Sequence, residues 1–439
     1  MKRKLLSLAA VVVATLSFAQ EVYTTQNANI PMQSAGVRDF SVVDTNTAWV
    51  TFYDGSGGGT YPRYVGVTTN GGSTWNTRLA SSLASSALIS DVQGLNGTTA
   101  FMVTAPTGSV GSANGLWKTT NAGESWTKIQ GVFSSASFGN IVHIWDNGTG
   151  LVIGDPVNNK YEMYKTTDFG NTWTTLTTAP IPDTQDEYGY VGGKVLFENH
   201  IWLTSNTGKI LHSADYGTTW DHYYTPLTDF AGEDMSGDMA FSSPTYGLIV
   251  DSNSMLWYTE NGGEEWDIKE SANYFNGDLA YVPGTENTFI STGIAAASLL
   301  GTGTAYSNDG GTTWETLDAL DQRGAIGVLD RATVYVGHFT SSATGEGGIL
   351  KLNNPIPEGL AVTDLTSNKV ELKAVVNNRT LNLVANKEIK STLITDMTGR
   401  KVTEVAAKDI NISNLKPGAY VARVAYADGA YGTVKFLVK

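Results

Sequence analysis

The chain has 439 residues, with 28 Lys and Arg, 42 Asp and Glu, 48 Gly and no Cys. This length allows roughly two or three domains. A charged fraction of only 16%, beside abundant Gly and aromatic residues, is typical of a turn-rich β protein rather than a helical or disordered one. The lack of Cys excludes disulfides and thiolate metal sites, and the net charge of −14 argues against a nucleic acid partner.

The first 19 residues have the three-part pattern of a secretory signal peptide. Lys2, Arg3 and Lys4 form a basic start, residues 5–18 form an apolar stretch, and Ala19 supplies a small residue for cleavage. The alternative is an N-terminal membrane anchor, but the apolar run is short for a span of about 20 residues. We therefore expect residues 1–19 to be removed, and the sequence predicts no transmembrane segment further along the chain.

An eight-residue unit that ends in Trp recurs six times between residues 68 and 314. Its third and eighth positions are, copy by copy, Asn70 and Trp75, Asn121 and Trp126, Asp168 and Trp173, Asp215 and Trp220, Asn261 and Trp266, and Asp309 and Trp314. Successive Trp residues lie 51, 47, 47, 46 and 48 residues apart. A period of this length is typical of one four-stranded propeller blade.

The chemistry of the repeated unit is that of a turn. Asp or Asn bonds back to nearby backbone N–H groups, Gly supplies positive φ, and Ser or Thr hydroxyls cap the turn. The Trp adds a large apolar contact beside the hairpin. We expect the three copies with Asn, and the one in which Glu265 replaces Thr, to be weaker turns rather than lost blades.

These residues resemble the Asp-box of sialidases, sortilin-type receptors, xyloglucanases and photosystem II assembly propellers, over residues 36–320. The resemblance implies a β-propeller. An alternative interpretation makes each box a ligand or calcium site, but each has too few carboxylates for a cation that prefers about six to eight oxygens. The five His residues include no His-x-x-x-His pair, so the sequence predicts no metal site and no cofactor.

The spacing predicts seven blades in a propeller domain that spans residues 20–355. Residues 36–355 hold between six and seven units of this period, and residues 324–352 read as three further strands without a box. We expect residues 21–34 to supply the outer strand of the seventh blade. Such closure leaves no unpaired edge strand.

Ligands of propellers bind on the face opposite the boxes, where loops surround the central channel. Three loops expected there, residues 181–191, 222–238 and 273–278, combine aromatic and acidic residues that suit sugar rings. The candidate aromatic ligand contacts are Tyr188, Tyr190, Tyr223, Tyr224 and Tyr274. The alternative is that these tyrosines pack on their own loops and the acidic residues face solvent.

Polar residues also recur where the inner strands are expected to begin. The candidate ligand-binding residues at the channel are Arg38, Asp39, Asp155, Asp238, Asp278 and Arg323. Two carboxylates about 5–10 Å apart would suit glycoside hydrolysis. A water-filled channel with Arg–Asp pairs is the alternative, and the catalytic residues stay unassigned.

The catalytic features of the enzyme families that share the box are not well matched in this chain. The sialidase family requires Arg-Ile-Pro in the first blade, whereas this chain has Val37-Arg38-Asp39-Phe40, and its propeller region has only five Arg. The xyloglucanase family uses two facing propellers, so hydrolysis of a neutral polysaccharide is kept only as an alternative. Residues 38–49 resemble the blades of photosystem II assembly propellers most closely, which implies a binding or scaffold role.

Composition changes after residue 355. Residues 356–439 hold 12 Lys and Arg against 8 Asp and Glu, whereas residues 21–355 hold 13 against 34. The two prolines of residues 353–357 predict a linker. Short alternating segments with a turn at residues 398–400 then predict a small β-sandwich.

Three segments of this last region, residues 394–402, 412–420 and 435–439, resemble in order the C-terminal sorting domain of type IX secretion cargo. The family's usual Tyr-Pro-Asn-Pro opening is replaced here by Val-Val-Asn-Asn at residues 375–378. A generic accessory sandwich is the alternative. The resemblance implies a Bacteroidetes-type cell, contact with the type IX machinery through residues 356–439, and passage through the periplasm to the outer-membrane surface or the medium.

The sequence therefore predicts an all-β secreted chain that acts as a binding or adhesion module for extracellular glycan or protein. Its alternative function is hydrolysis of a neutral polysaccharide. It predicts no nucleic acid partner.

Overall fold

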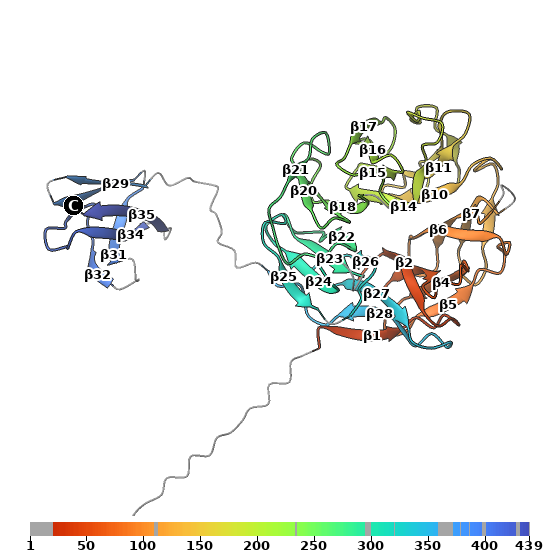
Figure 1. The fold of residues 1–439 in the computed structure, drawn as a ribbon, viewed down its shortest axis with the longest axis horizontal. Helices are drawn as coiled ribbons and strands as arrows, with labels where there is room; N and C mark the ends of the chain where they lie inside the picture. The colour runs from red at the N-terminus through yellow and green to blue at the C-terminus, as the bar shows by residue number, and fades with distance from the viewer. Residues whose placement is uncertain are drawn as a thin grey trace, which may run out of the picture. The chain divides into compact units, whose positions relative to one another are not determined.

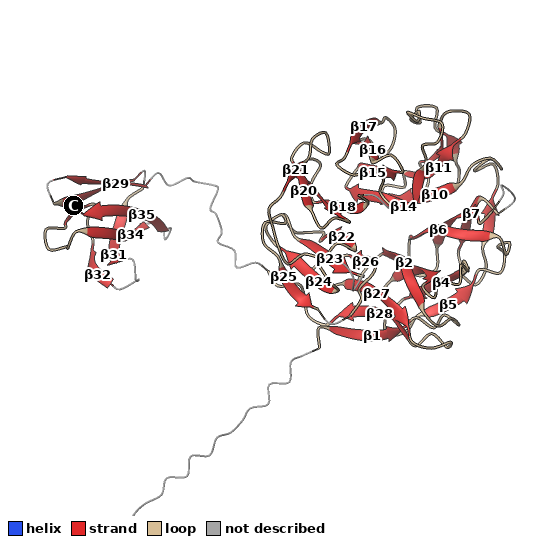
Figure 2. Ribbon diagram, in the orientation of Figure 1, coloured by secondary structure: helices blue, strands red, loops and turns tan. Residues whose placement is uncertain are grey.

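The computed structural model describes residues 21–108, 113–232, 235–294, 300–319, 321–358, 372–377, 379–385, 387–396, 401–426 and 431–438. The predicted signal peptide and the predicted turn at residues 398–400 lie outside these ranges. The described residues form strands and turns without a helix (Figure 2). The chain divides into two compact units, residues 1–359 and 360–439.

The first unit holds seven antiparallel sheets of four strands each, arranged around a ring (Figure 1). Blades 1 to 3 consist of β2 (Ala35–Val42), β3 (Ala48–Asp54), β4 (Tyr64–Thr68) and β5 (Asn76–Leu79); β6 (Ala87–Gly94), β7 (Ala100–Pro106), β8 (Gly115–Thr119) and β9 (Thr127–Ile129); and β10 (Gly139–Ile144), β11 (Gly150–Pro156), β12 (Tyr161–Thr166) and β13 (Thr174–Thr175). Blades 4 to 6 consist of β14 (Gly189–Phe197), β15 (His200–Ser205), β16 (Lys209–Ser213) and β17 (Asp221–Tyr224); β18 (Gly237–Phe241), β19 (Gly247–Asp251), β20 (Leu256–Thr259) and β21 (Asp267–Ile268); and β22 (Asp278–Tyr281), β23 (Phe289–Gly293), β24 (Gly303–Ser307) and β25 (Glu315–Asp318). The prediction of a seven-bladed propeller is confirmed.

The seventh blade joins the two ends of the propeller. It contains β26 (Ile326–Val328), β27 (Val334–Thr340) and β28 (Gly347–Leu352), and its outer strand is β1 (Tyr23–Asn27). β1 pairs with β28 antiparallel, with Tyr23 opposite Leu352 and Asn27 opposite Gly348. The expected closure by the N-terminal segment is confirmed, and it removes the free edge that β28 would otherwise present.

Each repeated unit forms the turn between the third and the outer strand of its blade. In the last copy, Oδ1 of Asp309 accepts the backbone N–H of Thr313 at 2.8 Å, and Oδ2 accepts the Thr313 hydroxyl at 2.7 Å. The Ser307 hydroxyl donates to Oδ1 at 2.9 Å and accepts the N–H of Gly311 at 2.8 Å. These contacts satisfy backbone groups that a tight turn would leave unpaired.

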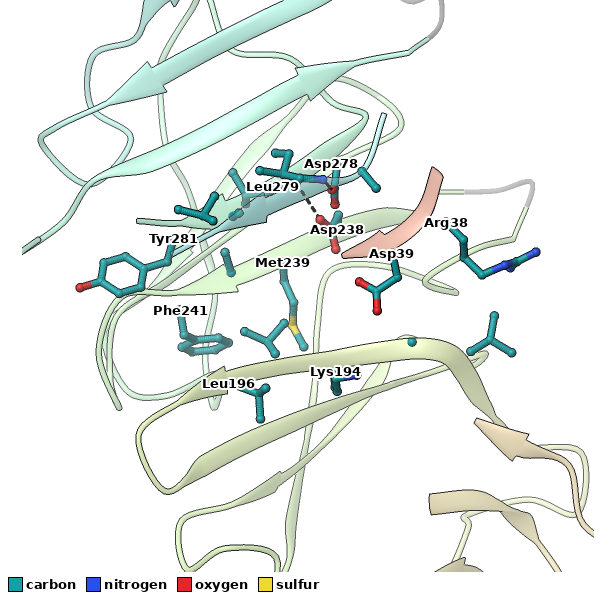
Figure 3. A pocket seen from close by; sticks show the side chains of 18 of the residues that line it. Arg38, Asp39, Lys194, Leu196, Asp238, Met239, Phe241, Asp278, Leu279 and Tyr281 are labelled. Atoms are coloured by element: carbon teal, nitrogen blue, oxygen red, sulfur yellow. Dashed lines mark hydrogen bonds between the residues drawn. The ribbon is translucent and has the colours of Figure 1, made fainter. Parts of the chain in front are cut away.

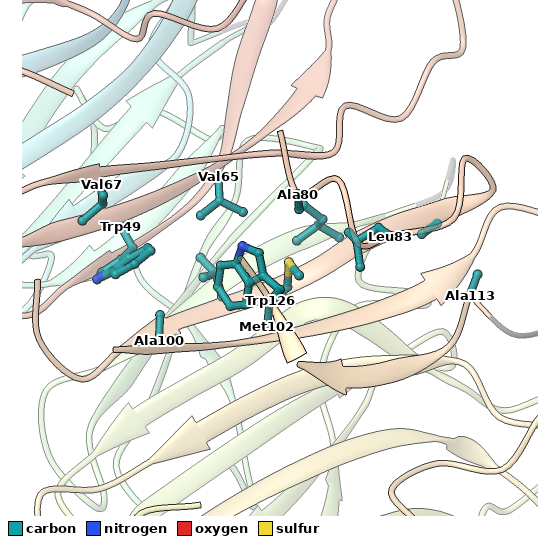
Figure 4. Close-up of a cluster of buried hydrophobic side chains, with 12 residues drawn as sticks. Trp49, Val65, Val67, Ala80, Leu83, Ala100, Met102, Ala113 and Trp126 are labelled. Atoms are coloured by element: carbon teal, nitrogen blue, oxygen red, sulfur yellow. The ribbon is translucent and has the colours of Figure 1, made fainter. Parts of the chain in front are cut away.

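The core lies between neighbouring blades. One cluster joins blades 1 and 2 and includes Trp49, Met102 and Trp126 (Figure 4), all at most 4% exposed. The rings of Trp49 and Trp126 meet edge to face with centroids 6.3 Å apart. The Trp of this box therefore packs between two neighbouring blades, beside its own hairpin. This is the apolar contact that the sequence predicted for it.

The segment predicted to be a linker, residues 353–357, lies against the propeller instead. Ile356 is 1% exposed and packs in the cluster that joins blades 6 and 7. The guanidinium of Arg331 donates to the carbonyl of Pro357 at 2.8 Å. Burial of an apolar side chain between the two prolines explains why the propeller unit continues beyond residue 355.

The second unit is a two-sheet β-sandwich. One sheet orders β29 (Leu372–Asn377), β30 (Thr380–Ala385) and β33 (Asp409–Asn411), and the other orders β32 (Lys401–Val405), β31 (Ile389–Asp396), β34 (Gly418–Tyr426) and β35 (Tyr431–Val438). Its own core includes Leu381, Ile394 and Val424. In the described part of the chain, no helix could span a membrane.

Candidate functional site

The inner strands of the propeller surround a central cavity of about 370 Å³ (Figure 3). Its charged lining consists of Arg38, Asp39, Lys194, Asp238 and Asp278. The inner strands of blades 1, 4, 5 and 6 therefore each place a charged residue at the channel. The structure brings together four of the six polar residues predicted for the channel.

The channel carboxylates bind the neighbouring blades. Oδ2 of Asp91 accepts the backbone N–H of Val142 at 2.8 Å. Asp238 accepts the N–H of Leu279 at 2.7 Å, and Asp278 accepts the N–H of Ile326 at 2.6 Å. Each bond runs from the inner strand of one blade to the inner strand of the next. These carboxylates therefore act as links in the ring.

Together with Asp39, these three carboxylates form two hydrogen-bonded pairs, Asp39 with Asp91 and Asp238 with Asp278. Burial raises the pKa of Asp39 to about 7; Lys194 opposes this rise, and Asp91 adds to it. Burial also raises the pKa of Asp238, and burial together with Asp238 raises that of Asp278 well above its usual range. Like charges this close cannot both stay ionised away from water, so Asp39 and Asp278 hold protons near neutral pH.

Lys194 supplies the opposite charge on the other side of the channel. Its ammonium forms an ion pair with Asp91, whose side chain is fully buried. The second oxygen of Asp91, Oδ1, has no other partner among the described residues, so a protonated Asp39 supplies the donor that it lacks. The wall is therefore a neutralised network rather than a set of free carboxylates.

Asp155 takes part in a fourth link between neighbouring blades, outside the channel cavity. Its Oδ1 accepts the side-chain N–H of Asn140 at 2.7 Å and the backbone N–H of Gly189 at 3.2 Å. Burial raises the pKa of Asp155 to about 6. This carboxylate connects blade 3 to the start of blade 4.

A second cavity of about 300 Å³ lies beside the central one and shares Arg38, Asp278 and Ala325 with it. We call this second cavity the mouth; its other lining residues are Val37, Tyr53, Gly277, Ile294 and Gly324. A Cβ at Gly36 would lie 2.4 Å from the Tyr53 ring. Glycine at this position therefore lets the Tyr53 ring lie over β2 beside Arg38.

Arg323 has a different role from the one predicted for it. It is 7% exposed, and its Nη2 lies 3.1 Å from Oδ2 of Asp318. Its guanidinium also stands over the ring of Tyr23, 5.7 Å from the centroid. Arg323 lines neither of the two cavities; it joins blade 6 to the closing strand.

The acidic loop at residues 181–191 surrounds a buried lysine. Nζ of Lys209 lies 2.7 Å from Oε1 of Glu187 and 3.2 Å from Oδ2 of Asp183, and the Lys209 and Glu187 side chains are fully buried. Glu187 also accepts the Tyr161 hydroxyl at 3.0 Å. These carboxylates compensate a buried charge, so they are not free for a ligand.

The predicted aromatic contacts lie apart from the channel, and none lines either cavity. Tyr188 is 42% exposed and its ring meets that of Tyr190, which donates to Asp229. Tyr223 and Tyr224 lie on β17, the outer strand of blade 4. Tyr274 is 5% exposed and donates to the carbonyl of Ser254 at 2.7 Å.

Two features of the site carried no clear signal in the sequence. Tyr53 stands at the end of a second strand, where alternation alone gives no reason to expect a channel residue. Lys209 begins β16, and its partner Glu187 precedes it by a whole hairpin. Within the described ranges, no group of three or more His, Asp and Glu side chains is arranged to hold a metal ion.

Comparisons with known proteins bear on both units. Residues 360–439 match the secretion system C-terminal sorting domain. Two solved structures of YCF48, one bound to a D1 peptide and one from Cyanidioschyzon merolae, each align with 76% of this chain at a TM-score of 0.52. The identities are 18% and 14%, and the alignments cover 97% and 99% of those chains. At such identities the likeness concerns the fold alone.

Two further similarities are partial. Mouse sortilin is 27% identical over 180 residues, which is 36% of this chain and 21% of sortilin, so the chain spans about a fifth of that relative's length. A GH74 xyloglucanase from Xanthomonas campestris aligns with 91% of this chain and 68% of its own at 13% identity, with a TM-score of 0.31. The chain therefore consists of a seven-bladed β-propeller followed by a secretion system C-terminal sorting domain, which directs it by type IX secretion to the cell surface or the extracellular space.

Proposed function

We propose that the propeller is a binding module that takes an extracellular ligand, a glycan or a protein, at the mouth of its channel. The sorting domain directs the chain to the cell surface or the extracellular space. The predicted signal peptide and the family resemblance of residues 394–439 support a Bacteroidetes-type cell, with the protein on its outer-membrane surface or in the medium. The propeller unit, which ends at residue 359, forms the binding domain, and residues 360–439 contact the type IX machinery.

The observation that carries this proposal is the state of the channel carboxylates. A glycoside hydrolase needs one carboxylate to protonate the leaving group and another free to attack or to activate water. Here Asp91, Asp238 and Asp278 each accept a backbone N–H of the next blade. Residues held in this way keep the ring rigid, and a rigid ring positions the loops of one face for recognition.

The test measures retention and cleavage together. The purified chain is passed over immobilised neutral and acidic polysaccharides and over peptide arrays, and the soluble fraction is assayed for released sugars. We expect retention on at least one surface without released sugars. Sugar release that accompanies retention would contradict the binding proposal.

The second candidate is hydrolysis of a neutral polysaccharide, and one observation favours it. Asp238 and Asp278 form a hydrogen-bonded pair in which one carboxyl keeps its proton, and environments that separate two carboxyl pKa values are typical of acid–base pairs. A direct hydrogen bond, however, leaves no room for a sugar between the two groups. Asp238→Asn separates the candidates: Asp238 lines the central cavity and not the mouth, so its loss would abolish sugar release by a hydrolase and leave retention by a binding module unchanged.

A further inference from the structure

The guanidinium of Arg38 stands out among the arginines of the propeller, because it makes no hydrogen bond or ion pair with any described residue. Its Nε is buried without a partner. The other four have partners: Arg63 donates to the Leu83 carbonyl, Arg78 to the Ala122 carbonyl, Arg323 to Asp318 and Arg331 to the Pro357 carbonyl. A buried donor without an acceptor costs free energy unless a ligand satisfies it.

The surroundings of Arg38 add further donors and an apolar wall. The hydroxyls of Tyr53 and Tyr61 are near enough to influence its pKa, and neither hydroxyl has a hydrogen-bond partner in the described chain. Val37, Ile294 and Ala325 line the mouth beside it. Figure 3 shows that the Arg38 side chain extends away from the carboxylate of Asp39. A planar cation with flanking phenol donors matches an acceptor with two oxygens, which is a carboxylate.

We propose that the mouth binds the terminal carboxylate of an extended peptide, with Arg38 pairing the carboxylate and the last side chain, an apolar one, packing on Val37, Ile294 and Ala325. This inference rests on the proposed binding function and names its ligand class. The rest of the peptide would then lie on the face of the propeller around the mouth.

Two features favour a peptide end over an acidic sugar. The mouth offers only aliphatic and glycine surface beyond Arg38, Tyr53 and Asp278, whereas a sugar ring needs a polar partner for each buried hydroxyl. The strongly acidic propeller region also attracts a ligand whose body is basic. A basic peptide with a free C-terminus satisfies both the long-range field and the local cation.

The experiment uses the purified full chain and two peptide libraries. Both libraries consist of acetylated decapeptides with Lys-rich bodies and randomised last four positions; one ends in a free carboxylate and the other in an amide. We expect the chain to retain free-acid peptides with an apolar last residue, and to bind the corresponding amides about tenfold more weakly or worse.

Arg38→Gln is the test variant, and Arg78→Gln is its matched control for the loss of one positive charge. Because Arg38 makes no hydrogen bond or ion pair within the described chain, we expect Arg38→Gln to keep the thermal stability of the parent while losing about tenfold or more in affinity for the selected peptides. Arg78→Gln should bind them as the parent does. Equal affinity of Arg38→Gln and the parent would overturn the proposal.

The polysaccharide panel distinguishes failure of the terminal-carboxylate site from failure of the proposed binding function. Retention of neutral glycans without retention of any peptide would leave the binding function standing and overturn the terminal-carboxylate site. Arg38-dependent retention of oligogalacturonate in preference to peptides would assign the cation to a uronic acid and likewise overturn it. Loss of retention on every surface would overturn both.

Discussion

Asp39 and Asp91 stand on the inner strands of adjacent blades, and the channel wall holds them within hydrogen-bonding reach of each other. In water such a pair would ionise fully and separate. Here burial removes that option, so one proton is retained and Lys194 neutralises the remaining charge. The identity of a residue as Asp therefore says little about its charge until its neighbours are known.

The raised pKa of Asp39 has a consequence for stability. The folded chain holds the Asp39 proton up to about pH 7, whereas an unfolded chain releases it near pH 4. The folded chain binds more protons in this window, so stability falls as the pH rises through it. We expect Asp39→Asn to remove this loss and to stabilise the chain at pH 8 by up to about 4 kcal/mol.

Denaturant unfolding at pH 5 and pH 8 checks this expectation. The parent should lose stability between the two values, and Asp39→Asn should lose less. The exposed Asp146→Asn is the control and should behave as the parent does. An equal loss in parent and Asp39→Asn would show that Asp39 is ionised across the window.

Lys209 gives a second test at the scale of a single side chain. Lys209→Met leaves the fully buried Glu187 without its cation, which should destabilise the propeller by roughly 3–5 kcal/mol. The double variant with Glu187→Gln should recover a large part of the loss, because no unpaired charge then remains. Thermal unfolding of both measures this; equal stability of the single and double variants would contradict the pairing.

The sequence could not foretell this use of the acidic loop. The loop of residues 181–191 combines acidic residues with tyrosines, a pattern that predicts sugar contacts, and Asp183 and Glu187 belong to it. Their lysine lies on a strand that follows the loop, and only the fold brings the two together. Tyr274 shows the same limit, since exposure in a short loop and burial against Ser254 have the same sequence pattern.

At the scale of one turn, the first two boxes with Asn form the same hydrogen bonds, and the third such box differs from them. Asn70 accepts the N–H of Thr74 at 3.0 Å and donates its own N–H to the Thr74 hydroxyl at 2.9 Å. The direction of one hydrogen bond is reversed relative to an Asp box, but the contact remains. In the fifth copy, Glu265 replaces the hydroxyl residue, so the side chain of Asn261 keeps only its bonds to Thr259 and the Glu265 backbone.

The fifth box should therefore be repairable, but only by two changes together. Asn261→Asp with Glu265→Thr restores both the acceptor oxygen and its hydroxyl donor, and we expect it to stabilise the chain by about 1 kcal/mol. Asn261→Asp alone adds a charge beside Glu264 and Glu265 and should gain nothing. Thermal unfolding of the two variants distinguishes these outcomes, and an equal gain from the single change would refute the role of the hydroxyl.

For the whole molecule, the number of blades could be read from the sequence because each box places one Trp per blade. The seventh blade has no box, and its alternating segments still predicted three strands. The identity of its outer strand followed from the need to close the ring. The ion pair of Arg323 could not be predicted from the repeat, because its partner Asp318 belongs to the outer strand of the preceding blade.

The closure of the ring by β1 also predicts which core residue keeps β1 in place. Ile30 follows β1, is fully buried and packs in the cluster that joins blades 7 and 1. We expect Ile30→Ala to cost about 2–5 kcal/mol and to increase hydrogen exchange of the β1 amides. Ile89→Ala, in a cluster between blades 1 and 2, is the control: a similar loss of stability with β1 still protected. Equal exposure of β1 in both variants would contradict a local role for Ile30.

The pairing of β1 with β28 sets an order of assembly. Asn27 and Gly347 are 320 positions apart, so the first strand of the propeller has no partner until nearly the whole domain has been synthesised. A chain cut short before β28 keeps an open edge, which favours aggregation and proteolysis. The sorting domain follows β28, so any chain that carries the export address also carries the strand that completes the ring. Translation thereby couples eligibility for export to the capacity to fold.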